Sequence, residues 1–596
     1  MPKRKEDAVR KRTVITLLIF FLLTGFSWLA GQQNPEEGKF IKTLETYLDD
    51  MWKFYPTAAT LLGYYKYNDK LEDMSEANID RRHDALDNYR QLFMAKIDRS
   101  KLSAEVEIDL EIALDSLDYE TLKHENLLPW EYNPLFYNEL FYYSLQGLLG
   151  KEFAPLEARL KSAIERAKLL PKLIQQAKSN LKTPPQLFTE TAIKQFPAIL
   201  DFYRNEIPKL VEAASADAKT RFQAEIAKII PALEDYQKFL QAELLPRSTG
   251  NFRLGEVHPR LLRITLQNSI PLDELIARSR ADYNNLRREM AIVSMPLYRI
   301  MYPQINMEQL STQYTEEQLR NLFIRGVIDK IKGAHPTKEN FIDTVKNEAG
   351  ALKDFLAKNN LVELPAEPLN IIPMPAFRRG VSLARLIGPG AYETTGAYNA
   401  EISPLPEEWT PEQVNVFLED FNNYFLYFWV NGNVFPGPFV PLAMTRNNPS
   451  LLRKLYPNQP LLKGWPIYLN EMLITSGFGE YDLKVRMNEL KYLLQVVIDF
   501  QLDLNIHQGG MTKEQAIDLM TKGGFQSPVE AERKWNQIIL NPGEAMYAYV
   551  GYQEIMDLEK EYRKLKGEAF SPKEFLRQLL SYGALPIRHL KTKIMK

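Results

Sequence analysis

The residues that could do chemistry in this 596-residue chain are few and lie far apart in the sequence. There is no cysteine, so thiolate catalysis, disulfides, cysteine zinc sites and an N-terminal lipid-modified cysteine are excluded. The six histidines are His83, His124, His258, His335, His507 and His589. No two of them have the spacing of an HExxH or Cys/His metal site, and the sequence contains no G-x-S-x-G elbow, P-loop or G-x-G-x-x-G motif.

One histidine has a carboxylate at helical spacing. Asp503 precedes His507 by four residues, which places both on one face of a helix. Such a pair could do acid–base chemistry, but a lone histidine–carboxylate pair is more often a core-edge or capping contact. Glu471 and Glu544 could supply a second carboxylate pair, with solvated or helix-end carboxylates as the alternative.

A short basic patch lies in a proline-rich part of the chain. It consists of Arg378, Arg379 and Arg385, and it could hold a carboxylate or a phosphate or simply be solvated. The formal net charge of the whole chain is −2, so no overall field favours nucleic acid. Nucleic acid is therefore not an expected partner.

The elements that would position these residues are predicted to be almost entirely helical. Apolar residues recur at helical spacing in most of the chain, and Leu483–His507 shows the clearest stripe. Pro171 is expected to kink or split a long helix over Pro155–Leu181. A small β ribbon is expected near 366–403, where prolines interrupt a β-leaning stretch. The sequence predicts an all-α fold with two lobes around a cleft.

The N-terminus predicts export. Basic residues between Lys3 and Arg12 precede an apolar run from Val14 to Ala30, so residues 1–31 form a signal peptide or a membrane anchor. Both outcomes fit, because the run is close to the ~17–25 residues that span a bilayer. We expect the bulk of the chain to be periplasmic or anchored to the inner membrane. Residues 32–596 form one helical domain, with lobes at about 37–300 and 301–596.

Several short motifs in consistent order resemble the bacterial domain of unknown function 885 family. The resemblance runs from about Phe40 to Leu590, and its segments are Phe54–Gly63, Leu245–Gly255, Pro542–Ala545 and Gly583–Pro586. Members of this family look like helical gluzincin metallopeptidases, with a His-Glu-x-x-Pro-Gly-His pattern and a downstream Glu-Gly-Trp-Ala-x-Tyr. In such sites two imidazoles and a carboxylate hold Zn²⁺, and a nearby glutamate takes a proton from its water.

The resemblance places this pattern between Trp429 and Glu471, where an aromatic helix leads to Pro436-Gly437 and a second helix is expected to open on Gly464-Trp465. The four chemical positions then fall on Gly432, Asn433, Pro438 and Lys463, and none can do the expected work. The family positions kept in this register are Trp465, Tyr468, Asp503 and His507, whereas Glu544 replaces the glutamine of the family's Pro-Gly-Gln-Ala motif. We therefore expect the zinc to be lost and no other cofactor to be used.

The leading interpretation is a catalytically inactive, exported relative of these peptidases. It would bind a peptide, an envelope component or a protein partner in its helical cleft, and its N-terminal segment would contact the inner membrane if it is not cleaved. Possible cleft residues are Trp465, Tyr468, Asp503, His507 and Glu544. Two alternatives are a hydrolase with a rearranged site, built from Asp503, His507 and Glu544, and a structural subunit of an envelope complex.

Overall fold

Helices make up 72% of the computed structural model, which describes residues 34–595, and a small three-stranded sheet is the main exception. The prediction of an all-α fold with a small β region is therefore confirmed. The predicted signal or anchor at residues 1–31 lies outside the described residues. Within residues 34–595, no helix combines the length and apolar character needed to cross a membrane.

The first described helix is bounded at both ends by residues that favour helix termini. The Asn34 side chain accepts a hydrogen bond from the Glu36 N–H, Pro35 occupies the first turn, and α2 (Pro35–Phe54) ends before Pro56. Its predicted apolar stripe, which includes Phe40 and Trp52, is buried. The other long helices of the N-terminal half are α4 (Glu76–Ala95), α5 (Ala104–Leu122), α7 (Pro134–Leu149), α8 (Leu156–Asn180), α9 (Gln186–Asp201) and α11 (Ala216–Phe239).

The structure bears on two expectations about helix bounds. Helix α8 continues through Pro171, so the predicted split does not occur and the predicted kink stays a prediction. The helix expected to open on Gly464 is α21 (Gln459–Thr475), which begins one turn earlier because the Asn458 side chain caps the Leu461 N–H. The remaining larger helices are α12 (Val257–Leu266), α13 (Leu272–Met301), α15 (Glu316–Ile331), α16 (Phe341–Asn359), α17 (Pro411–Asp420), α18 (Leu426–Asn433), α19 (Phe439–Arg446), α22 (Leu483–His507), α24 (Pro528–Leu540), α25 (Tyr547–Lys566), α26 (Pro572–Ser581) and α27 (Ile587–Ile594).

The sheet has the strand order β1-β3-β2, with strands at Leu369–Pro373, Tyr398–Ile402 and Ala384–Ile387 in that order. β3 pairs in parallel with β1 and antiparallel with β2, and Glu401 lies opposite both Ile372 and Arg385. The sequence indicated β1 and β3. It did not indicate β2, which is only four residues long and includes a charged residue.

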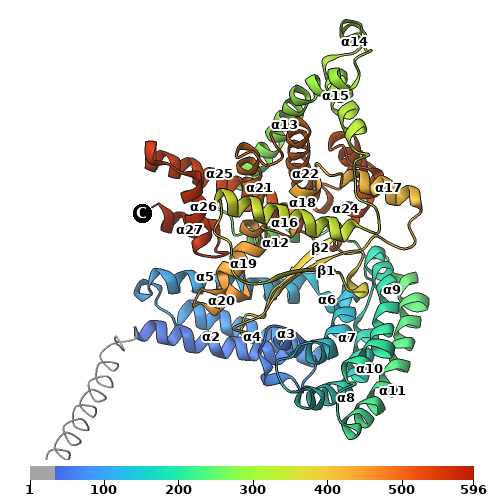
Figure 1. Ribbon diagram of the computed structural model, residues 1–596. Helices are drawn as coiled ribbons and strands as arrows, with labels where there is room; N and C mark the ends of the chain where they lie inside the picture. Colours follow the sequence, from blue (N-terminus) through green and yellow to red (C-terminus); the bar gives the residue numbers. More distant parts are fainter. Residues whose placement is uncertain (1–33, 596) are drawn as a thin grey trace, which may run out of the picture.

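Apolar side chains form two large cores. One core combines α2, α4 and α5 with most helices after α12, and the other fills the space among α7, α8, α9 and α11. In Figure 1 the helices α2 to α11 form the lower part of the view, most later helices form the upper part, and the strands lie between them. The lobe boundary near residue 300 stays a prediction, because the larger core joins helices from both sides of it.

Candidate functional site

The first two positions of the His-Glu-x-x-Pro-Gly-His pattern fall on Gly432 and Asn433, at the end of α18. A Cβ atom at Gly432 would lie 2.0 Å from the Tyr492 hydroxyl oxygen, so this hydroxyl occupies the space in which a larger side chain would begin. The Asn433 amide turns back and donates to the Trp429 carbonyl at 3.0 Å. Tyr492 is buried, and burial raises the pKa of its hydroxyl, so it stays neutral.

The other two positions also offer no metal ligand. Pro438 precedes α19 and has no ligand atom. The Lys463 ammonium lies 3.5 Å from the Asn433 side-chain oxygen, and burial lowers its pKa while Glu544 opposes that change. Glycine, asparagine, proline and lysine together do not fit a zinc ion, because the first and third have no donor and the last repels a cation. Within residues 34–595, no three histidine or carboxylate side chains gather closely enough to hold a metal ion.

Trp465 is a structural residue of this region. It is fully buried, and its indole N–H donates to the Gly437 carbonyl at 2.7 Å. One residue earlier, a Cβ at Gly464 would lie 2.3 Å from the Gly551 carbonyl carbon, so α21 and α25 pack with their backbones in contact. These contacts hold the Pro436-Gly437 turn, α21 and α25 in fixed relative positions.

Asp503 and His507 lie together, and the structure adds His258, which the sequence did not indicate as their partner. The His258 Nε2 and Asp503 Oδ1 atoms are 2.8 Å apart, and both side chains are fully buried. That contact is close but poorly aligned for a hydrogen bond, whereas the other Asp503 oxygen accepts the Gly543 N–H at 2.9 Å. The rings of His258 and His507 lie 5.1 Å apart. We name His258, Asp503, His507 and Gly543 the signature cluster.

The signature cluster brings three family-like segments together. The Gly255 N–H donates to the His507 carbonyl at 2.9 Å, and Arg253 donates to the Ile506 and Met511 carbonyls beside it. His507 Nε2 lies 3.2 Å from the Ile538 carbonyl, and burial lowers the pKa of His507 although Asp503 opposes that change. The cluster therefore joins the segment before α12, the end of α22 and the turn before α25. Nothing in the local sequence around His258 identifies it as the third member.

Glu544 is the predicted site residue that reaches solvent. Its side chain is exposed, yet the surrounding protein raises the pKa of its carboxyl, with Lys463 opposing and Asp503 adding to the effect. Tyr119 on α5 is 38% exposed, and its pKa is raised first by burial and in part by the Glu544 charge. We name the surface shared by Lys463, Glu544, Tyr547 and Tyr119 the Glu544 recess.

Other predicted groups lie elsewhere. Glu471 accepts a hydrogen bond from Arg486 at 2.6 Å, so its carboxylate is paired with that arginine. Tyr468 is buried and packs 5.8 Å from the Phe575 ring, where burial raises its pKa. Tyr468 thus belongs to the contact between α21 and α26.

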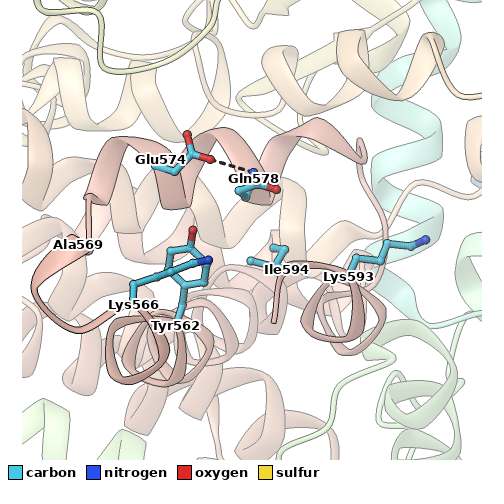
Figure 2. A pocket seen from close by; sticks show the side chains of 7 residues that line it. All are labelled: Tyr562, Lys566, Ala569, Glu574, Gln578, Lys593 and Ile594. Carbon is cyan, nitrogen blue, oxygen red and sulfur yellow. Dashed lines mark hydrogen bonds between the residues drawn. The ribbon is translucent and has the colours of Figure 1, made fainter. Parts of the chain in front are cut away.

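Two cavities lie on other parts of the surface. Figure 2 shows the larger one, of about 330 Å³, where Tyr562 on α25 and Glu574 and Gln578 on α26 face each other near Lys593 of α27. The second, of about 220 Å³, is lined by Arg378 and Arg385 of the predicted basic patch together with Gln195 and Asn541. The Arg378 guanidinium already contacts the Tyr143 hydroxyl and lies 3.4 Å from Glu139.

The geometry describes a large helical protein in which scattered segments converge on a buried signature cluster beside a polar recess. The chain belongs to the DUF885 family, a bacterial protein family of unknown function, whose model matches residues 56–594. It is similar to a solved structure described as "a putative lipoprotein of unknown function" from Shewanella oneidensis, with 25% identity and a TM-score of 0.76, over 94% of this chain and 100% of that one.

A second solved structure shows the same fold. It is described as a "putative lipoprotein" from Colwellia psychrerythraea and is 14% identical, with a TM-score of 0.71, over 95% of this chain and 99% of that one. No curated protein matches this chain. The comparisons therefore support the family resemblance drawn from the short motifs.

Proposed function

We propose that this protein is an exported, membrane-associated binding protein that does not use the zinc chemistry of the peptidases it resembles. One observation carries the proposal. At the four chemical positions the chain has Gly432, Asn433, Pro438 and Lys463, and the space beside Gly432 is filled by the Tyr492 hydroxyl. A histidine at position 432 would require Tyr492 to move, so the region is rebuilt around the loss.

The expected ligand is a peptide segment, bound in the Glu544 recess. Lys463 and Glu544 present opposite charges without a direct ion pair between them, and the aromatic rings of Tyr119 and Tyr547 flank them. Peptides offer both charged ends and apolar side chains to such a surface. The export signal in the sequence, and the description of two similar structures as lipoproteins, support a location outside the cytoplasm.

Burial favours binding over the alternative of a rearranged hydrolase. Asp503 and His507 are 0% and 1% exposed, and their polar atoms contact His258, Gly543 and Ile538. A general base must reach the proton that it removes, directly or through one water. Glu544 alone among the three proposed catalytic residues reaches solvent.

Metal analysis of the purified full-length protein tests the proposal first. We expect less than stoichiometric zinc and no chelator-sensitive cleavage of a quenched fluorescent peptide mixture. Stoichiometric zinc, or cleavage that a chelator abolishes, would overturn the proposal. Cleavage that resists chelators but is lost in Glu544→Gln would establish the hydrolase instead.

Binding itself is measured by fluorescence polarisation with a labelled mixture of short peptides. We expect Lys463→Met and Glu544→Gln each to weaken binding about tenfold or more, since each removes a charge in a desolvated site. The matched control is Glu532→Gln, an exposed carboxylate paired with Lys513. Equal binding by all variants would show that the ligand does not bind in this recess. A partner that co-purifies in detergent and still binds the Lys463 and Glu544 variants would favour a structural subunit.

A further inference from the structure

A buried guanidinium and a buried imidazole in the N-terminal half have no hydrogen-bond partner. Arg82 on α4 is 3% exposed, and His124 in the π-helical turn η3 (Lys123–Leu127) is 8% exposed. Within residues 34–595, none of the three Arg82 side-chain nitrogens and neither His124 ring nitrogen makes a hydrogen bond. Leaving such groups unpaired in a protein interior is costly, because arginine keeps its charge.

Aromatic rings place these two side chains beside each other. The Arg82 guanidinium lies 5.8 Å from the rings of both Tyr47 and Phe54. The His124 ring lies 6.1 Å from the same Phe54 ring and 4.7 Å from Trp130. His83, next to Arg82 in the chain, stacks on His124 at 6.0 Å. Arg82 and His124 therefore both lie beside the Phe54 ring, among aromatic neighbours.

Two cations, Arg82 and Lys123, and two carboxylates, Glu120 and Asp50, lie around this place. Lys123 donates to Glu120 at 2.8 Å and to the Tyr55 hydroxyl at 3.2 Å, which leaves Arg82 as the second cation beside one buried carboxylate. The remaining acid, Asp50, is 41% exposed and lies 3.9 Å from the Arg82 guanidinium, beyond hydrogen-bonding distance. Burial lowers the pKa of His124 to about 4, so at neutral pH it carries one N–H donor and no charge. Arg82 therefore has a long ion pair with a partly exposed carboxylate but no hydrogen-bond acceptor within the described residues.

The backbone at this place is unusual as well. The α5 helix passes directly into the π-helical turn η3, and the next residue, Leu128, has a left-handed conformation with φ 41° and ψ 57°. Leucine rarely adopts this conformation, and π-turns and such outliers occur preferentially at functional sites. Here they set His124 against Trp130 and place Lys123 beside Glu120.

We propose that this place binds a small monovalent anion of the halide type, held by the Arg82 guanidinium and the His124 N–H. A halide fits better than phosphate, because the surrounding rings of Tyr47, Phe54 and Trp130 offer few donors for the several oxygens of a phosphate. The bound anion accepts the hydrogen bonds that Arg82 and His124 do not make within the described residues. This site is separate from the Glu544 recess and does not depend on the proposed function.

Crystals of the full-length protein soaked in sodium bromide provide the direct test. We expect an anomalous scattering peak within hydrogen-bonding distance of the Arg82 guanidinium and the His124 ring. Ordered water at that place with no anomalous signal would overturn the proposal. Peaks confined to exposed lysines would do the same, since those show an adventitious ion only.

Melting temperatures in solution give an independent test. In sodium chloride the wild type should melt about 1–2 °C higher than in sodium gluconate of equal ionic strength, because the anion binds only the folded protein. Arg81→Met is the matched control, since Arg81 is exposed and contacts only Asn78, and it should keep the full shift. Arg82→Met should lose it, and so should His124→Phe if the arginine variant does not fold. A shift that persists in both variants, or one caused by phosphate but not chloride, would contradict the halide site.

Discussion

Two buried polar regions of this protein differ in how well their side chains are hydrogen-bonded. In the signature cluster each side chain keeps at least one hydrogen-bonding contact: His258 Nδ1 lies 2.8 Å from the Gln508 amide nitrogen, Asp503 accepts the Gly543 N–H, and His507 Nε2 lies 3.2 Å from the Ile538 carbonyl. Around Arg82 the ion pair of Lys123 and Glu120 is satisfied, but Arg82 and His124 have no hydrogen bonds within the described part of the chain. Side chains that keep hydrogen bonds to neighbouring segments hold those segments together, whereas Arg82 and His124, with none, are the basis of the proposed anion site.

The difference changes where function is expected. The family-like motifs direct attention to α18, α21 and α22, where the structure shows packed glycines, a buried tryptophan and a closed cluster. The accessible polar groups are instead at the margin, at Glu544 and Lys463, and across from them on α5. Family motifs thus mark the structural frame of this protein, and the residues that face solvent between its halves are the better candidates for ligand contact.

Removing Asp503 should give the largest effect and tests whether the signature cluster is structural. Asp503→Ala leaves His258 and the Gly543 N–H buried without their partner, so we expect a loss of about 3–5 kcal/mol in the free energy of unfolding. Chemical denaturation measures it. Asp518→Ala is the control, because Asp518 is 60% exposed and should change stability by less than about 0.5 kcal/mol. A small loss in Asp503→Ala would mean that the cluster serves a role other than packing.

His124 gives the second largest expected effect, through pH. Its pKa is about 4 in the folded protein and 6.5 ordinarily, so between these values the unfolded chain binds a proton that the folded protein does not. Stability should therefore fall as the pH drops from 6.5 to 4, by roughly 3 kcal/mol at about 1.4 kcal/mol per pH unit. The measurement is denaturation in chloride-free buffers. His124→Gln should flatten this part of the curve, and the loop variant His335→Gln should not; identical curves for wild type and His124→Gln would contradict a neutral buried imidazole.

The third largest effect on stability is expected at Gly464, where α21 packs closely against α25. A Cβ at Gly464 would lie 2.3 Å from the Gly551 carbonyl carbon and 2.4 Å from the Tyr552 nitrogen, both backbone atoms that cannot move away alone. We expect Gly464→Ala to cost about 1–3 kcal/mol in spite of alanine's better helix propensity. Gly350→Ala, in α16 with no atom within 4 Å of the added Cβ, should instead gain up to about 1 kcal/mol. Thermal denaturation compares the two; a gain in both would show that α21 and α25 can separate.

The sequence predicted the helices more accurately than the contacts made by the candidate site residues. Helical periodicity gave the bounds of α22, Leu483–His507, as observed, because its apolar stripe is continuous. Periodicity carries no information about long-range partners. It therefore could not predict that His258 contacts Asp503, 245 residues later in the chain, or that Glu471 pairs with Arg486. Strand β2 was missed because four residues are too few to show alternation. The proximity of Arg82 and His124 is equally invisible in sequence, because it depends on how α4, η3 and the ring of Phe54 meet.

The smallest expected effect tests how tightly Tyr492 packs against Gly432. Gly432→Ala brings a Cβ to 2.0 Å from the Tyr492 hydroxyl oxygen and to 3.2 Å from the ring carbon that carries it. We expect a cost of about 1–2 kcal/mol in the free energy of unfolding, of which about 1 kcal/mol should disappear when Tyr492→Phe removes the hydroxyl. Gly350→Ala combined with Tyr492→Phe is the matched cycle and should be additive, because the two sites share no contact. An additive Gly432–Tyr492 cycle would mean that the hydroxyl yields easily, and then a histidine at position 432 would still be compatible with this fold. A clear coupling would instead establish that the Tyr492 hydroxyl occupies the space beside Gly432 and resists displacement from it.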